Sequence, residues 1–182
     1  MTQSMTQAMP PLMPKFVMNS AIKLATVCLL FLLAAATWGC TKPAPQAQLL
    51  ETKKCADCDL TGKDLSQADL AQGVLNRAVL KDANLTGANL SSALLDSANL
   101  SGANLTNANL EKAGLASAQL QGANLTGANL KGAFLRNADL SNANLSGADL
   151  TNSDLSGANL TGAEMKDTLL KGAILPDGKL QN

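Results

Sequence analysis

The sequence predicts an all-β solenoid, and three features of the chain point to it. Leucine occupies every fifth position from Leu60 to Leu175, with Met165 as the one exception. A small residue, usually alanine, stands two positions before each leucine except Leu65, which has Lys63 there, and no insertion interrupts the count. Self-similarity at a fixed short period is the signature of a solenoid, in which each unit packs only against its neighbours.

A period of five excludes a long amphipathic helix. Because a helix buries positions three and four apart, a five-residue step would spread the leucines around the whole cylinder. The letters A-N-L, as in "ANLTGANL" at 83–90, are instead two-periodic, so alanine and leucine point inward and asparagine points outward. The two residues that follow are often Gly, Ser, Thr or Asn, which suit a tight turn. We therefore expect short strands that alternate with corners and close into coils.

Over 55–175 the repeat closely resembles the A-(D/N)-L-x-x pattern of the pentapeptide-repeat family. The resemblance implies a right-handed quadrilateral parallel β-helix with four pentapeptides in each coil. The span from Leu60 to Leu175 then makes about six coils. Stacked at ~4.8 Å, these coils form a rod roughly 29 Å long with leucine columns inside.

Residues 1–40 are expected to direct export. The stretch from Leu24 to Gly39 contains no charged residue, and Lys15 and Lys23 flank it on the N-terminal side. This apolar run is short for a membrane span and suits the core of a signal peptide. The repeat region is therefore expected to be extracytoplasmic, membrane-anchored or periplasmic.

The end of the apolar run leaves three alternatives open. Cys40 after Gly39 resembles the bacterial lipobox, which makes Cys40 the lipidation candidate, although Trp38 departs from that pattern. The three alanines at 34–36 suit ordinary signal peptidase instead. An uncleaved membrane anchor is the third alternative. Each of the three connects the chain, at least during export, to a membrane.

Residues 41–54 are expected to form a tether and an N-terminal cap. The stretch 41–48 has two prolines and no apolar face, so we expect it to be unstructured. Leu49 and Leu50 are expected to plug the open end of the first coil with a short helix or turn, because an unprotected strand edge invites pairing with other chains.

Cys55 and Cys58 form the sequence CADC at the entry to the first coil. Outside the cytoplasm this pair is a disulfide candidate, with unpaired thiols as the alternative. Redox catalysis would need a thioredoxin-like context, and a zinc site would need about four ligands, which a chain without His does not offer. We therefore expect no metal and no cofactor. Cys28 lies in the apolar segment and is expected to be inert.

Departures from the repeat single out one wall of the rod. The middle residue of each unit points to solvent, and on one wall four of the six are apolar, interrupted by Gly114 and Asp154. Aligned apolar groups favour association, whereas scattered ones are normal on any protein surface. Phe134 is the expected anchor. The partner-binding candidates are Val74, Leu94, Phe134 and Ile174, together with Leu169 from another wall.

Two polar columns are expected on a different wall. Asn84, Asn104, Asn124 and Asn144 are spaced by twenty residues, and so are Thr86, Thr106 and Thr126. Hydrogen bonding to the local backbone explains Asn and Thr at turns better than a ligand does.

Residues 176–182 end the repeat as a C-terminal tail. Pro176 and the Asp177–Gly178 turn stop the pattern, and no long helix follows that would cover the last strand edges. A homodimer through the C-terminal coil is therefore a reasonable hypothesis.

The composition argues against catalysis and against nucleic-acid binding. Without His the chain lacks an ordinary proton shuttle, and a filled β-helix leaves little room for a pocket. The 14 basic residues balance the 14 acidic ones, so no basic field attracts nucleic acid. We expect a non-enzymatic structural or protein–protein interaction module at the cell envelope. Its protein partner is unidentified, and the N-terminal segment or a lipid attaches it to the membrane.

The family resemblance adds one location and one alternative function. Exported members with a CxxCDL entry to the first coil occur in photosynthetic bacteria, so a thylakoid lumen is permitted as well as a periplasm. Another branch protects topoisomerases by imitating DNA, and a topoisomerase-interacting role is the alternative. Residues 56–175 carry twelve acids and eight bases, a net charge of −4 that is weak for a phosphate mimic.

Overall fold

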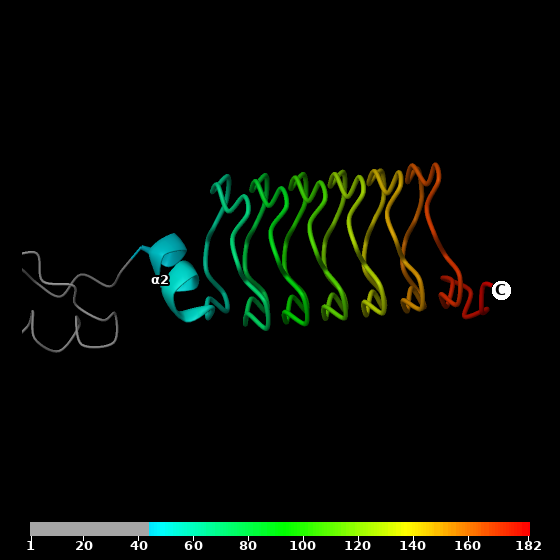
Figure 1. The fold of residues 1–182 in the computed structure, drawn as a ribbon, viewed down its shortest axis with the longest axis horizontal. Helices are drawn as coiled ribbons and strands as arrows, with labels where there is room; N and C mark the ends of the chain where they lie inside the picture. The colour runs from blue at the N-terminus through cyan, green and yellow to red at the C-terminus, as the bar shows by residue number, and fades with distance from the viewer. Residues whose placement is uncertain (1–43) are drawn as a thin grey trace, which may run out of the picture. The chain divides into compact units, whose positions relative to one another are not determined.

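The computed structural model describes residues 44–182, which form one β-helical rod with a helix at its N-terminal end (Figure 1). The predictions on residues 1–43 lie outside the described residues. They include the signal segment, the lipidation of Cys40 and the environment of Cys28.

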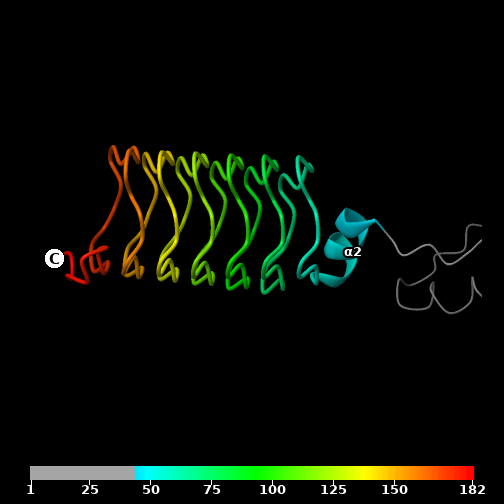
Figure 2. The same cartoon turned by 180° about the vertical axis from the view of Figure 1, so that it is seen from behind.

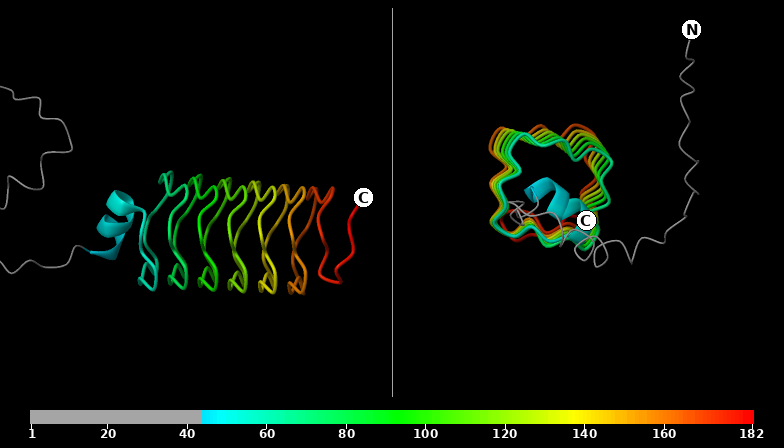
Figure 3. Two further views of the ribbon diagram at one scale, coloured as in Figure 1. Left: turned by 90° about the horizontal axis from the view of Figure 1, so that it is seen from below. Right: turned by 90° about the vertical axis from the view of Figure 1, so that its left-hand side faces the viewer.

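Parallel bridges between residues twenty positions apart build the rod. Val74 pairs with Leu94, and Asn84 pairs with Asn104, in two of the four ladders. Four pentapeptides therefore complete one coil, and the end view shows a four-sided outline (Figure 3). In residues 44–182 each unit contributes one isolated bridge and no longer strand. No strand end delimits a coil, so the count of about six coils stays a prediction.

Every corner from 57 to 172 is a β-turn with a left-handed residue in its third position. The leucine carbonyl accepts a hydrogen bond from the residue three positions on, as in Leu75 O to Ala78 N at 3.0 Å. The third turn residue has a φ of +55° to +72°, the geometry of a type II turn. Gly and Asn adopt this conformation readily, but Arg77 and Lys112 also adopt it. The stacked backbone therefore imposes the turn on residues that do not favour it.

The core consists of columns of leucine and alanine. These side chains form one buried cluster that extends from Leu49 to Ala173, with Cys55 near its N-terminal end. Each coil stacks on the next through backbone hydrogen bonds, such as Leu75 N to Leu94 O at 2.8 Å. The five-residue step thus predicted the inward positions correctly.

Helix α2 (Pro45–Thr52) covers the N-terminal end of the rod (Figures 1 and 2). The unstructured tether expected over 41–48 is therefore wrong from Pro45 onward. Proline is favourable in the first helical turn, where its missing N–H has no intrahelical partner. Leu49 is fully buried beneath the helix, whereas Leu50 is 49% exposed. Leu49 alone plugs the core.

Two glutamine side chains of α2 donate hydrogen bonds to backbone carbonyls of the first coil, which has no preceding coil to bond them. The Gln46 amide donates to Asp64 O at 2.7 Å, and the Gln48 amide donates to Lys54 O at 3.0 Å. Further along the rod, the equivalent carbonyls accept from leucine N–H groups of the preceding coil. The helix therefore satisfies part of the open backbone edge.

The C-terminal tail turns back onto the last coil. Leu180 forms an antiparallel bridge with Ile174, and Gln181 N donates to Ala173 O at 2.8 Å. The core is less well covered here than beneath α2. Leu160, Met165 and Leu170 are only partly buried.

Candidate functional site

The most distinctive surface is the ladder that begins at Lys54, and we call its stretch from Val74 onward the apolar wall. Its bridged residues succeed one another at intervals of twenty: Val74, Leu94, Gly114, Phe134, Asp154 and Ile174. Leu94 is 45% exposed and Phe134 is 52% exposed. The structure thus brings four of the five sequence-predicted partner-binding residues onto one wall.

Leu169, the fifth candidate, does not belong to this wall. Its bridge partner is Asp149, in the ladder that also contains Asn129. Leu169 is 55% exposed, but it stands alone among polar neighbours. Its place on another wall agrees with the twenty-residue spacing.

Leu180 is a member of the apolar wall that the repeat pattern missed. Its antiparallel bridge with Ile174 places both side chains on the same face of the paired backbones. Leu180 is 61% exposed. The Asp177–Gly178 turn was the available signal, because this dipeptide favours hairpins and the chain does double back there.

Asp154 lies in a recess of the wall, and its charged carboxylate is hydrogen-bonded within the protein. The residue is 6% exposed, and its carboxylate accepts hydrogen bonds from the Ser156 hydroxyl at 2.6 Å and the Ser156 N–H at 3.0 Å. The Arg136 guanidinium also bonds it from the preceding coil. Together these donors hold the pKa of Asp154 below its usual value, with the Ser156 hydroxyl contributing most. The charge is therefore satisfied within the protein.

Gly114 forms a second recess between the two largest apolar side chains. The Asp96 carboxylate lies beside it, 3.2 Å from the position that a Cβ would occupy. Asp96 Oδ1 accepts from the Ala116 N–H at 2.9 Å, so one of its oxygens is already bonded. Leu94 and Phe134 thus stand on either side of a small gap in the ladder.

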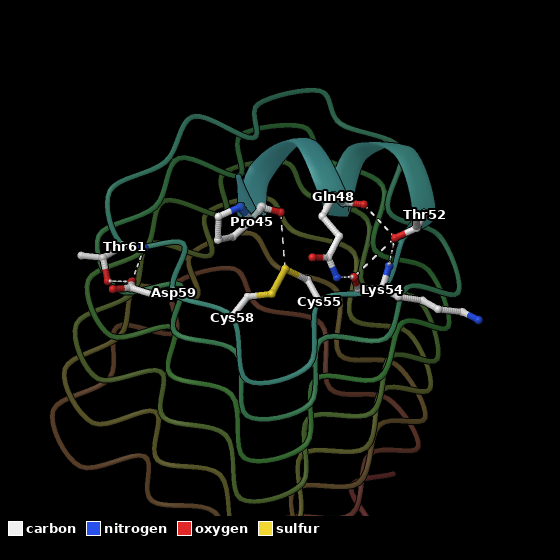
Figure 4. Close-up of a disulfide and its surroundings, with 8 residues drawn as sticks. All are labelled: Pro45, Gln48, Thr52, Lys54, Cys55, Cys58, Asp59 and Thr61. Atoms are coloured by element: carbon white, nitrogen blue, oxygen red, sulfur yellow. Dashed lines mark hydrogen bonds between the residues drawn. A yellow bond between two sulfur atoms is a disulfide. The ribbon is translucent and has the colours of Figure 1, made fainter. Parts of the chain in front are cut away.

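Cys55 and Cys58 are joined by a disulfide at the corner beneath α2 (Figure 4). Their Cα atoms are 5.3 Å apart, and the Cys55 sulfur lies 3.4 Å from Pro45 O at the start of the helix. Cys55 is buried in the core cluster. The bridge therefore links the first corner of the coil to the region that holds the cap.

The described part of the chain has no cluster of metal ligands, and it has an open hollow at its C-terminal end. In residues 44–182 no three Cys, Asp or Glu side chains converge as metal ligands. An open hollow of about 420 Å³ lies beside the C-terminal tail. Its lining comprises Thr151, Asn152, Lys171, Gly172, Leu180, Gln181 and Asn182. This set offers one lysine and no acid–base pair.

The family pattern described as "Pentapeptide repeats (8 copies)" matches residues 74–111, 118–157 and 138–177. These segments cover more than half of the chain. The chain belongs to the pentapeptide repeat family. Proteins of this family form right-handed quadrilateral β-helices, in agreement with the four-walled rod of this pentapeptide repeat protein.

Solved pentapeptide repeat proteins share the repeat with this one. Rfr23 of the cyanobacterium Cyanothece 51142 is 31% identical, with 69% of this chain and 92% of Rfr23 covered and a TM-score of 0.36. A protein of the Arabidopsis thaliana thylakoid lumen is 29% identical, with 74% of each chain covered and a TM-score of 0.25. QnrB1, a plasmid-mediated fluoroquinolone resistance protein, is 21% identical, with 71% and 84% covered and a TM-score of 0.27. A search of curated sequences finds no match.

The polar columns of this pentapeptide repeat protein satisfy its own backbone. Asn84 Oδ1 accepts from both the N–H and the hydroxyl of Thr86, at 3.2 and 2.7 Å. On the next wall, the Asn129 amide donates to Asn109 Oδ1 at 3.0 Å, along the ladder. These bonds support the interpretation of the columns as turn geometry and not as a ligand site.

Among residues 44–182, no helix is both long enough and apolar enough to cross a membrane.

Proposed function

We propose that this pentapeptide repeat protein is an exported, non-catalytic module that binds a partner protein through its apolar wall. The observation that carries the proposal is the alignment of Leu94 and Phe134 in one ladder of a rod whose other ladders are mainly polar. Aligned apolar side chains on a flat surface mark interaction sites, and aromatic residues commonly anchor them. No enzyme family is indicated by the family match.

Three features support a place outside the cytoplasm, at the cell envelope or in a thylakoid lumen. The apolar segment from Leu24 to Gly39 suits an export signal. The disulfide between Cys55 and Cys58 is typical of oxidising compartments. A similar protein is from the thylakoid lumen of Arabidopsis thaliana. Palmitate labelling of the wild type but not of Cys40→Ser is the expected result for a lipid anchor, and an unlabelled wild type removes that anchor.

Photo-crosslinking in the native membrane fraction tests the protein partner. A crosslinking amino acid at position 134 is expected to attach a defined protein, and the same amino acid at position 119 is the matched control. Gln119 is exposed and its bridges belong to a different ladder. Phe134→Asp is expected to fold normally and to lose the partner, while Gln119→Asp keeps it. A Phe134→Asp protein that retains every partner contradicts the proposal.

A homodimer through the C-terminal coil is a separate proposal, supported by the open end of the core. Leu160, Met165 and Leu170 are half-buried, and their backbone N–H groups have no hydrogen-bond partner among residues 44–182. Such an edge favours pairing with another chain. On this proposal, light scattering shows a dimer that Met165→Lys abolishes and Phe134→Asp leaves intact. A monomeric mass at high concentration argues against it.

The alternative function, binding a topoisomerase as a DNA mimic, makes a different prediction. The mature protein would then protect gyrase in a supercoiling assay. The net charge of −4 over 56–175 is small for this role, so we expect no protection.

A further inference from the structure

We propose that the partner on the apolar wall is a second copy of this chain, whose rod lies antiparallel and face to face with the first. The inference rests on the proposed function, because it names the partner of the same wall. The inference starts from the relief of the wall, meaning which of its residues protrude and which are recessed. Leu94 and Phe134 protrude, Gly114 and Asp154 are recesses, and Val74 and Ile174 at the two ends are half-buried.

This relief is self-complementary about one two-fold axis. The axis runs along the strand direction and passes midway between Gly114 and Phe134, which is also the middle of the wall. It places Phe134 opposite Gly114 of the second copy and Leu94 opposite Asp154 of the second copy. Val74 then lies opposite Ile174 of the second copy. Leu94 and Phe134, the two protruding side chains of the central coils, each meet a recess. At the ends of the ladder the same axis places Leu180 opposite Lys54 of the second copy.

The corners that border the wall agree with the same register. Glu111 of one copy lies opposite Lys131 of the other, and Arg77 lies opposite Asp177. Each of these four side chains also has an ion-pair partner in its own chain, so the contacts across the interface add to existing pairs: the partners are Lys112, Asp149, Asp57 and Lys179. No charged corner residue between 71 and 177 lies opposite a like charge in this arrangement. Opposite charges across an interface favour the correct register and penalise others.

Neighbouring registers fit less well. If one copy shifts by one coil along the rod, Gly114 lies opposite Gly114 of the second copy, so two recesses meet. The same shift places Lys112 opposite Lys112 and Glu111 opposite Glu111. A shift in the other direction opposes two Phe134 side chains. Parallel rods oppose every residue to its own copy, which again stacks Phe134 on Phe134. The relief therefore selects the antiparallel, centred register over these three.

The Asp154 recess does not oppose this packing. Its carboxylate already accepts bonds from Arg136 and Ser156, so burial beneath Leu94 leaves this charge with its partners. At the other recess, the Asp96 carboxylate beside Gly114 accepts from the Ala116 N–H and lies next to the Phe134 side chain of the second copy. Five steps of ~4.8 Å separate Val74 from Ile174, which gives a contact about 24 Å long. One wall of this length lies near the lower limit of specific interfaces, so we expect a dissociation constant of the order of micromolar.

Light scattering of the full chain across a concentration series tests the dimer. The wild type is expected to approach twice the monomer mass at high micromolar concentration. Phe134→Asp is expected to raise the dissociation constant by roughly tenfold or more, and Gln119→Asp is the neutral control. Glu111→Lys is expected to weaken the dimer, and adding Lys131→Glu to it is expected to restore the wild-type mass. Restoration by the double exchange is a result that damage to the fold does not produce.

Disulfide trapping tests the register. In a background of Cys28→Ser and Cys40→Ser, a mixture of Glu111→Cys and Lys131→Cys chains is expected to crosslink, whereas each variant alone is not. A mixture of Thr106→Cys and Thr126→Cys, from a corner of another wall, is the control. Equal crosslinking in both mixtures overturns the register and with it the inference.

Three outcomes separate this inference from the other proposals. A chain that stays monomeric while position 134 crosslinks to another protein overturns the inference and leaves the proposed function standing. A monomer without any crosslinked protein overturns both. A dimer that is insensitive to Phe134→Asp overturns the inference and favours association through the C-terminal coil.

Discussion

Leu180 in the C-terminal tail pairs antiparallel with Ile174 in a chain whose other bridges in residues 44–182 are all parallel. The tail therefore has two effects at the same place. It covers the backbone edge of the last coil on one wall, and it lengthens the apolar wall by one leucine. The C-terminal end of the rod is the less covered one, and the tail covers it at the apolar wall.

Truncation of Leu49 is expected to destabilise the rod far more than truncation of Leu50. Leu49 is fully buried beneath α2, whereas Leu50, its neighbour in the same helix, is half exposed. Leu49→Ala is expected to cost about 2–5 kcal/mol through the cavity it leaves. Leu50→Ala is expected to stay within about 0.5 kcal/mol of the wild type. Urea denaturation followed by circular dichroism measures both, and equal effects contradict the capping role of Leu49.

The five-residue step predicted what the repeat itself determines. The inward columns follow from counting along the chain. The twenty-residue pairing, and with it the alignment of Leu94 with Phe134, follows from the family resemblance, which implies four pentapeptides in each coil. The same count places Leu169 beside Asp149, on a different wall from Phe134, as the bridges show.

The two ends were not predictable from the repeat, because neither end belongs to it. Helix α2 has only eight residues, and it begins with Pro45, a residue type that is also common in linkers. The fold of the tail depends on Leu180 finding the free edge next to Ile174, a contact that no periodicity encodes. Ends of solenoids are set by local edge cover, which varies independently of the repeat.

Replacing Ser153 with alanine is expected to stabilise the protein. Ser153 occupies an inward position where most units have alanine, and its buried hydroxyl has no hydrogen-bond partner among the residues the structure describes. Removing an unsatisfied buried hydroxyl is expected to gain about 1 kcal/mol. Ala113→Ser, two coils earlier in the same column, is the matched reverse change and is expected to destabilise. A Ser153→Ala protein that is less stable than the wild type contradicts this account.

Gly147→Ala is expected to destabilise the rod through backbone strain alone. The φ of Gly147 is +67°, and a Cβ added there would meet no other atom within 4 Å. The left-handed conformation costs an alanine about 1 kcal/mol, with no added clash or lost contact. Gly147→Asn is the control, because asparagine tolerates this conformation and Asn137 and Asn142 adopt it in this chain. Thermal denaturation is expected to rank glycine first, asparagine second and alanine last.

The free energy of unfolding is expected to be nearly constant between about pH 5 and pH 9 and to fall in acid. The reason is that eight aspartate side chains have a lower pKa in the folded protein than usual. The carboxyls with a lowered pKa are Asp57, Asp59, Asp64, Asp69, Asp139, Asp149, Asp154 and Asp177. Asp139 illustrates the cause, since its carboxylate accepts from the Ser141 backbone N–H at 3.0 Å and from the Gln121 amide at 2.7 Å. The chain has no His, which is the side chain whose usual pKa lies close to neutral pH.

The sign of the acid effect follows from these shifts. A carboxyl whose pKa is lower in the folded state binds protons less readily there than in the unfolded chain. Its contribution to stability is therefore complete above the ordinary carboxyl pKa of about 4 and is lost as the pH falls through the lowered value. Urea midpoints measured from pH 7 to pH 2 are expected to decline only below about pH 5, and less steeply in Asp139→Asn, which has one linked proton fewer. A decline that begins near pH 6 would contradict the assignment of these carboxyls as the titrating groups.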